Sequence, residues 1–324
     1  MKIILIAPGY KTLPPVGWGA VESIVWDYYE NLIKKGIETS IVNTPNVNQI
    51  ITECNQRIEL AGSNNSAVYI MYDDYIVVAP YIKCPRIYYM SHYAYITQPQ
   101  FRKKQPQYFT NIFSNVVKYQ NNIVINAISD EIAQIYENHG VDKRRINVIH
   151  NGAREDLFQY STTPTKPERS VYVAKIEARK RQYIYQNITS IDFVGNYHDT
   201  PFNTKSPQYL GEWDKPTLYN SLTEYGNLVL LSDGEADPLV VKEALIAGLG
   251  VVVSECASAN LDRNRAFITV IPNSRLDDIV YVEEMIQKNR EYCATHREEI
   301  REYALAKFSW NKIVDKFIKI VYTK

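Results

Sequence analysis

Two glutamates with the spacing E-x7-E, Glu235 and Glu243, stand where a strand is expected to lead into a helix. The apolar run ending at Leu231 predicts a buried strand, and the acidic loop SDGEADP follows it. Pro238 favours the start of a helix, which LVVKEALIAG continues as far as Gly248. One carboxylate is therefore expected in the loop and the other inside the helix. The backbone amides of the helix start lie between them, where a diphosphate can bind.

A basic segment forms the second group of candidates. VAKIEARKRQ, residues 173–182, carries Lys175, Arg179 and Lys180. Three cations so close together are candidates for binding an anionic group. The same cluster is also compatible with a solvated basic turn.

A glycine loop, GWGAVES (residues 17–23), nearly matches the dinucleotide-binding pattern G-x-G-x-x-G, but Glu22 replaces the last glycine. In a nicotinamide site the loop follows the first strand directly and the second strand ends in an acid. Here the loop comes late and IETSIVN ends without an acid, which disfavours a dehydrogenase. Gly17 and Gly19 still predict a close approach of backbone to a ligand.

Apolar runs that alternate with helical patterns position these candidates. Strands are expected at residues 2–7, 37–43, 67–71, 76–80, 86–90, 122–129, 146–152, 170–176, 190–197, 227–232, 250–255 and 267–272. Helices are expected at 20–36, 129–140, 238–247 and through the tail, and the polar segment 161–170 is the expected linker. This alternation predicts two α/β domains with mostly parallel sheets, whose ligands bind beyond the carboxyl ends of the strands.

Composition limits the class of protein. The chain has 324 residues, 45% hydrophobic and 22% charged, as in a globular protein of about two domains. Its net charge of zero gives no general attraction for nucleic acid. The cysteines lack zinc-site spacing, and no apolar stretch is long enough to span a membrane. We expect a cytoplasmic protein with no transmembrane segment, no nucleic-acid partner and no metal.

Several stretches together resemble the retaining glycosyltransferases of the GT-B fold, GT4 type. E-x7-E with EALIAGLGVVVS resembles the donor-site motif of that family, and VAKIEARKRQ resembles its phosphate-binding segment. GWGAVES is similar to the glycine loop of the acceptor domain, VIHNGAREDLF to the segment that closes this domain, and FSWNKIVDKFIKI to the terminal helix. The resemblance implies two Rossmann-like domains facing across a cleft, at 1–158 and 159–307, with a helix at 308–324 that packs back onto the first.

The resemblance also implies roles for single residues. Glu243 would bind the ribose hydroxyls of a nucleotide, Glu235 would contact the transferred sugar, and His92 would face the sugar or the acceptor. The tyrosine-rich segment 88–108 is a candidate lining for the acceptor groove. The expected catalytic residues are Glu235, His92 and Lys180, and the expected donor-binding residues are Gly17, Gly19, Lys175, Arg179, Lys180, Asp237, Pro238, Leu239, Val240 and Glu243.

The implied activity is transfer of a hexose from a nucleotide diphosphate sugar to a hydroxyl acceptor such as a glycan, with retention and without a metal or cofactor. UDP is the favoured nucleotide and GDP the second. The alternatives are a sugar-nucleotide epimerase, a non-catalytic nucleotide-sugar-binding subunit, and a metal-dependent enzyme that uses Asp233, Glu235 and Asp237. Two departures from the family pattern are Ala236-Asp237-Pro238, which adds a negative charge beside the expected anion site, and Arg181, where glycine is usual.

Overall fold

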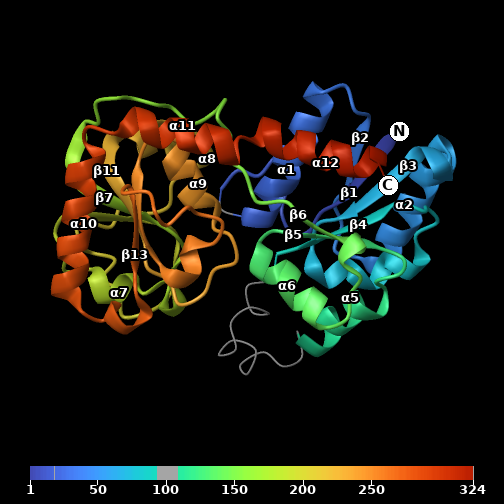
Figure 1. Cartoon of the computed structure of the whole chain (residues 1–324), viewed down its shortest axis with the longest axis horizontal. Coiled ribbons are helices and arrows are strands. Elements are labelled where there is room, and N and C mark those ends of the chain that lie inside the picture. Colours follow the sequence, from blue (N-terminus) through green and yellow to red (C-terminus); the bar gives the residue numbers. More distant parts are fainter. Residues whose placement is uncertain (18, 93–108, 324) are drawn as a thin grey trace. The chain divides into compact units, whose positions relative to one another are not determined.

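The computed structural model describes residues 1–17, 19–92 and 109–323, and it divides into two compact units. Unit 1 comprises Met1–His150 and Trp310–Lys324, and unit 2 comprises Asn151–Ser309 (Figure 1). The chain first crosses between the units after residue 150 rather than after the expected residue 158. Residues 151–158 belong to unit 2 because they bond there: the amide of Asn151 donates to Asp237, and the amide of Ala153 donates to the carbonyl of Phe308.

Unit 1 is built on a parallel sheet with the strand order β2-β1-β3-β4-β5-β6. Its described strands are β1 (Lys2–Ile6), β2 (Thr39–Val42), β3 (Ser66–Ile70), β4 (Ile87–Ser91), β5 (Val124–Ala127) and β6 (Ile146–Val148). Its described helices are α1 (Ala20–Lys34), α2 (Val47–Ala61), α5 (Ser114–Lys118), α6 (Asp130–Asn138) and α12 (Trp310–Thr323), with the short helices η1 (Ser63–Asn65), η2 (Asp73–Tyr81), η4 (Phe109–Phe113) and η5 (Lys143–Arg145).

The strands of unit 1 follow the apolar runs of the sequence. Ile3, Ile4, Leu5 and Ile6 of β1 have no exposed surface, as expected for a parallel strand covered on both faces. The strand expected at 76–80 is instead part of the 3-10 helix η2. Pro80 has no amide hydrogen for a sheet, and it lies in this helix.

Helix α12 packs onto unit 1 along its apolar face (Figure 1). Phe317 is fully buried, and its ring stacks on Tyr69 of β3 with 4.6 Å between ring centroids. Trp310, also buried, meets the ring of Tyr28 of α1 edge to face at 5.1 Å. The last residues of the chain thus complete the core of its first unit.

Unit 2 is built on a second parallel sheet with the order β13-β12-β11-β7-β9, beside a two-stranded sheet of β10 and β8. Its described strands are β7 (Lys166–Val173), β8 (Ile176–Glu177), β9 (Ile191–Val194), β10 (Tyr197–Asp199), β11 (Tyr225–Leu230), β12 (Gly250–Ser254) and β13 (Ile268–Ile271). Its described helices are α7 (Gln182–Tyr185), α8 (Lys215–Ser221), α9 (Leu239–Ile246), α10 (Ile279–Cys293) and α11 (Arg297–Phe308), with the short helices η6 (Ala178–Lys180), η7 (Leu222–Glu224), η8 (Glu255–Ser258) and η9 (Asn273–Arg275). Because β7 begins at Lys166, the expected linker 161–170 is half strand.

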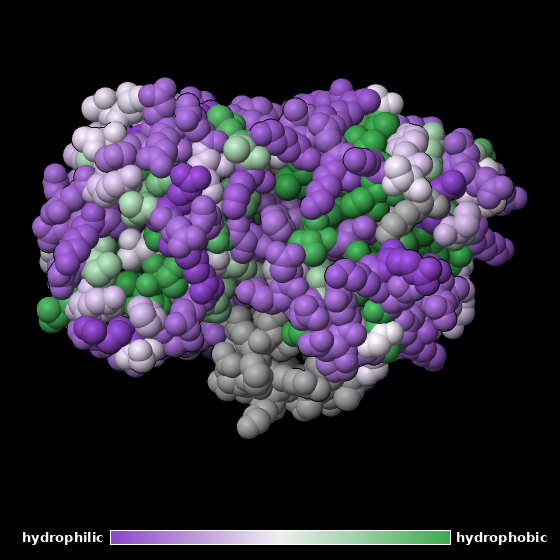
Figure 2. Space-filling view, viewed as in Figure 1, coloured by the Kyte–Doolittle hydropathy of each residue, from purple (hydrophilic) through white to green (hydrophobic). Residues whose placement is uncertain are grey.

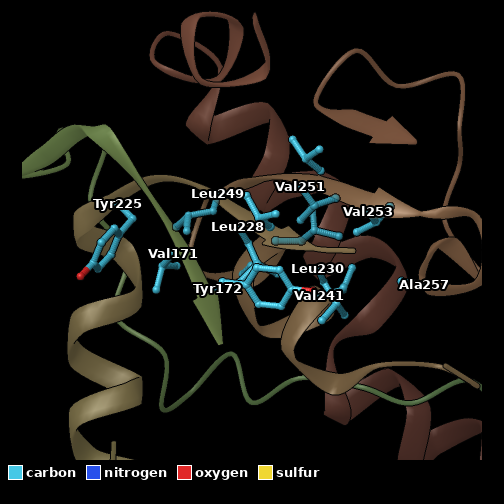
Figure 3. Close-up of a cluster of buried hydrophobic side chains, with 14 of the residues drawn as sticks. Val171, Tyr172, Tyr225, Leu228, Leu230, Val241, Leu249, Val251, Val253 and Ala257 are labelled. Carbon is cyan, nitrogen blue, oxygen red and sulfur yellow. The ribbon is translucent and has the colours of Figure 1, made fainter. Parts of the chain in front are cut away.

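The core of unit 2 lies between this sheet and its helices. Side chains of β7, β11, β12 and α9 meet there, among them Tyr172, Leu228, Val241 and Val251 (Figure 3).

Figure 2 shows one face of the molecule, where hydrophilic residues cover most of the surface. None of the helices in the described part of the chain is long and apolar enough to cross a bilayer.

The docking of α12 predicts the effect of Phe317→Ala. The change removes a buried ring and should cost unit 1 about 3–5 kcal/mol of unfolding free energy. Native-state hydrogen exchange should then show faster exchange of the β1 and β3 amides, with Lys319→Ala on the exposed side of the same helix as the control. Unchanged exchange in β1 and β3 would show that the helix does not support this core.

Candidate functional site

The candidate residues of unit 2 gather where the strand order of its sheet reverses. From β7 the chain goes to β9 on one side and then to β11 on the other, so β7 and β11 are neighbours whose following loops diverge. Ligands of open α/β sheets bind in the crevice at such a point. Lys175 follows β7 directly, and the loop that holds Glu235 follows β11.

A buried tyrosine ties these two loops together. The hydroxyl of Tyr172, at the end of β7, accepts the amide of Leu231 at 2.8 Å and donates to the carbonyl of Lys180. The amide of Asp233 donates to the carbonyl of Arg179 at 2.9 Å, which adds a direct bond between the loops. Tyr172 has no exposed surface, so the basic segment and the acidic loop are held in one arrangement by the core itself.

Lys180 and Glu235, both expected to be catalytic, form an ion pair. Their side chains are only 13% and 10% exposed. Arg179 lies 4.0 Å from the same carboxylate oxygen, bonds the carbonyl of Gly234, and donates to Glu177 at 2.6 Å. The structure therefore brings Arg179, Lys180 and Glu235 together as one network in which cations and carboxylates alternate.

Lys175 belongs to the edge of this network. Its ammonium group lies 3.6 Å from Glu177, and its carbonyl accepts the side-chain amide of the buried Gln182 at 2.9 Å. Gly195, at φ +149°, lets the chain after β9 touch this segment. A Cβ on Gly195 would stand 1.9 Å from the carbonyl oxygen of Ala174. The backbone of Lys175 is thus held on both sides.

Asp237 has a different environment from the one expected. Its carboxylate forms an ion pair with Lys242, and neither side chain has any exposed surface. The carboxylate also accepts the amide of Asn151 at 2.8 Å, and the side chain of Asn151 donates to the carbonyl of Asp237 at 2.9 Å. The negative charge that the sequence placed beside the anion site is therefore neutralised inside the protein.

Helix α9 starts directly after this pair, with Pro238 as its N-cap and Leu239 and Val240 in its first turn. Glu243 lies one turn further and is 9% exposed. Burial raises the pKa of its carboxyl above the usual value, and Lys215 opposes this only in part. Among the described residues, no hydrogen bond or ion pair to this carboxylate is found, so its oxygens are available to hydrogen-bond donors of a ligand.

In unit 1, Gly17 and Gly19 lie in the loop between β1 and α1. Gly19 is the N-cap of α1 at φ +148°, and a Cβ there would stand 2.7 Å from Oε2 of Glu22. Glu22 is buried in the first turn of the helix, where the helix dipole favours an acid. Gly19 therefore has a local reason to be glycine, and approach to a phosphate stays a prediction.

His92 follows β4 at the carboxyl edge of the unit 1 sheet. Burial lowers the pKa of its imidazole to about 4, although a hydrogen bond to the backbone of Met71 favours the protonated form. Nε2 is buried and has no hydrogen-bond partner in the described part of the chain. At neutral pH His92 thus carries a neutral ring with one unsatisfied nitrogen. Of the expected acceptor-groove segment 88–108, Tyr88 and Tyr89 are core residues of β4, and residues 93–108 lie outside the described residues.

The carboxylates proposed for a metal do not converge. Asp233 pairs with Arg181 at 2.9 Å, Glu235 with Lys180, and Asp237 with Lys242. Within residues 1–17, 19–92 and 109–323, no group of three metal-ligating side chains is found. Arg181 has a left-handed backbone (φ +57°), a conformation that glycine adopts most readily.

Sequence reasoning missed three residues that build this site: Tyr172, Lys242 and Asn151. Each acts through burial or through a partner distant in the sequence. Of the three, Lys242 could have been found from the sequence, since a lysine inside an otherwise apolar helix segment predicts a buried ion pair.

The ion pair of Asp237 and Lys242 predicts a large effect of Lys242→Met. The change leaves a buried carboxylate without its cation and should cost about 3–5 kcal/mol of unfolding free energy. The double variant with Asp237→Asn should recover part of this loss, because no unpaired charge remains. Urea unfolding of the two single variants and the double variant measures the coupling, and additive effects would contradict it.

Comparison with known proteins gives similarity in structure only. No protein-family model matches the chain, and no curated protein sequence matches it. The structure of Anabaena Alr3699/HepE in complex with UDP-glucose is 14% identical, covers 100% of both chains and has a TM-score of 0.73.

Two further structures agree over almost the whole chain. Sucrose-phosphate synthase from Thermosynechococcus elongatus is 14% identical with a TM-score of 0.74, covering 99% of this chain and 98% of its own. A glycosyltransferase from Rickettsia africae ESF-5 is 15% identical with a TM-score of 0.61, covering 99% and 97%. At these identities the likeness concerns the fold. The chain has the GT-B fold of glycosyltransferases, with two Rossmann-like units built on parallel sheets.

Proposed function

We propose that this protein is a glycosyltransferase that moves a hexose from a nucleotide diphosphate sugar to a hydroxyl of an acceptor. The observation that carries the proposal is Glu243, which lies on α9, the helix after β11. Its carboxylate is largely buried and has no hydrogen-bond partner among the described residues. A ribose offers two adjacent hydroxyl donors, which match the two oxygens of a carboxylate. The Anabaena protein was solved with UDP-glucose, which favours UDP as the nucleotide over GDP.

The basic segment suits the diphosphate. Arg179 and Lys180 contact the loop that leads into α9, and the free amides at the start of a helix favour an anion. Lys175 is joined to Arg179 through Glu177. In the unliganded chain these cations already have carboxylate partners, so an incoming diphosphate exchanges one anion for another. Their charge is then available to the leaving group without a metal.

Retention at the anomeric carbon follows from departure and attack on the same face of the sugar. The bond from C1 to the phosphate oxygen breaks, and the bond from C1 to the acceptor oxygen forms. The acceptor proton passes to the leaving phosphate, so no protein base is required. Glu235 holds the sugar hydroxyls while it is itself held by Lys180. His92, whose ring is neutral at pH 7, stays a candidate contact of the sugar or the acceptor.

The test of this function begins with a thermal-shift screen against UDP-, GDP- and ADP-glucose, followed by calorimetry with the best nucleotide and an assay of donor turnover with and without EDTA. Binding, metal-independent turnover and a product whose anomeric configuration is retained by NMR are expected. Isomerised nucleotide sugar without any acceptor would indicate an epimerase, and binding without turnover a non-catalytic subunit. Failure of every nucleoside diphosphate to bind would contradict the proposal.

The Lys180–Glu235 pair predicts the effect of Lys180→Ala on donor turnover. Loss of a cation beside the leaving group should lower kcat for UDP-glucose hydrolysis roughly 100-fold or more. The matched control is Lys288→Ala, which breaks a lysine–glutamate pair exposed on α10. If both variants turn over like the wild type, Lys180 does not act on the leaving group.

Glu243→Gln should have opposite effects on binding and stability. Gln loses the charged acceptor, so affinity for uridine should fall roughly tenfold or more. Because the pKa of Glu243 is raised in the folded state, unfolding releases a proton, and the wild type loses stability as pH rises through that pKa. The variant should therefore melt higher than the wild type at pH 8, and this advantage should disappear below about pH 4, where the carboxyl is protonated in both states.

Uridine is the suitable probe because it has no phosphate whose own titration overlaps that of the carboxyl. Wild-type affinity for uridine should fall as pH drops through the raised pKa, and Glu243→Gln should show no such dependence. A variant that keeps both the affinity and its pH dependence would remove Glu243 from the ribose site.

A further inference from the structure

The strand order of the unit 1 sheet also reverses at one place, which we call its switch point, and aromatic side chains lie there. From β1 the chain goes to β2 on one side and then to β3 on the other, so β1 and β3 are neighbours. Tyr10 lies in the loop after β1, and Tyr72 lies directly after β3. Their rings meet edge to face with 6.1 Å between centroids. The place where an open α/β sheet binds its ligand is thus bordered by two tyrosines.

Tyr10 is displayed by a loop that is held firmly. The amide of Gly9 donates to the side chain of Asn43 at 3.0 Å, and the same side chain donates to the carbonyl of Lys11 at 2.9 Å. The hydroxyl of Tyr75 donates to the carbonyl of Pro8 at 2.6 Å. Backbone groups on both sides of Tyr10 are therefore anchored, while its side chain stays 64% exposed. A large ring presented on an anchored loop loses little freedom when a ligand packs on it.

The groups around the ring are suited to a polyhydroxylated ligand. Burial raises the pKa of Tyr72, and the negative charge of the exposed Asp74, two residues further along the chain, raises it more. A carboxylate here accepts hydroxyl donors and repels an anionic ligand.

We propose that Tyr10 is a stacking platform for a neutral pyranose ring of the acceptor, with Asp74 accepting the hydroxyls at its rim. One face of a pyranose exposes C–H groups that pack on an aromatic ring, and its hydroxyls point outward to polar partners. The proposal rests on the proposed function, in which the groups that suit the ribose and the leaving diphosphate, Glu243 and the basic segment, lie in unit 2.

Binding of neutral oligosaccharides to the full chain tests the platform. Saturation-transfer difference NMR with cellotetraose and with maltotetraose should give signals from the sugar C–H groups with the wild type. Tyr10→Ala should weaken that binding roughly tenfold, whereas Tyr10→Phe, which keeps the ring, should retain it. The matched control is Tyr81→Ala, which removes a tyrosine that is 62% exposed on the same unit.

Three outcomes would overturn the platform: no signal from either oligosaccharide with the wild type, equal losses in the Tyr10→Ala and Tyr81→Ala variants, or a loss of UDP affinity in Tyr10→Ala, which would make the ring a partner of the base. The test is separable from that of the transferase. A chain that binds UDP but neither oligosaccharide contradicts the platform alone. A chain that binds the oligosaccharides through Tyr10 but no nucleotide contradicts the transferase and leaves the platform standing.

Discussion

The buried ion pair of Asp237 and Lys242 is the interaction on which the loop between β11 and α9 depends. A carboxylate with no exposed surface is tolerated only beside a cation, and Lys242 supplies it from the first turn of α9. The same carboxylate accepts the amide of Asn151, the first residue of unit 2. One charge therefore ties together the loop after β11, the start of the helix and the point where the chain enters the unit.

A second ion pair, between Lys180 and Glu235, involves the same loop. Lys180 and Glu235 are too buried to stand alone, so in the unliganded chain each satisfies the other. A diphosphate that enters must compete with Glu235 for the cation, and its two negative charges make it the stronger competitor. The proposed function then leaves Glu235 to sugar hydroxyls, which are weaker donors than an ammonium group. The ion pair therefore holds in place the same two residues to which the proposed function gives a role.

Much of this arrangement could be predicted from the sequence, because it depends on local patterns. The buried strands appear as apolar runs, and Glu235 and Glu243 are located by the strand, loop and helix that contain them. The same reasoning was wrong for η2, where it predicted a strand, since a short apolar run with a proline fits a buried 3-10 helix as well as a strand. The environment of Asp237 was beyond such reasoning. The sequence shows that Asp237 is acidic, but a local pattern cannot predict its contact with Asn151, which is 86 positions away in the sequence.

The two switch points differ in chemistry because their expected ligands differ. In unit 2 the crevice is lined by ionised groups that need counter-ions when they are half-buried, which is why cations and carboxylates alternate there. In unit 1 the described residues at the corresponding place include two tyrosines whose rings meet, with the carboxylates of Asp73 and Asp74 directly after the second of them. An aromatic face beside a carboxylate matches a ligand made of C–H faces and hydroxyls. The proposed function therefore assigns the charged part of a sugar nucleotide to unit 2 and an uncharged acceptor sugar to unit 1, through the side chains that follow each pair of neighbouring strands.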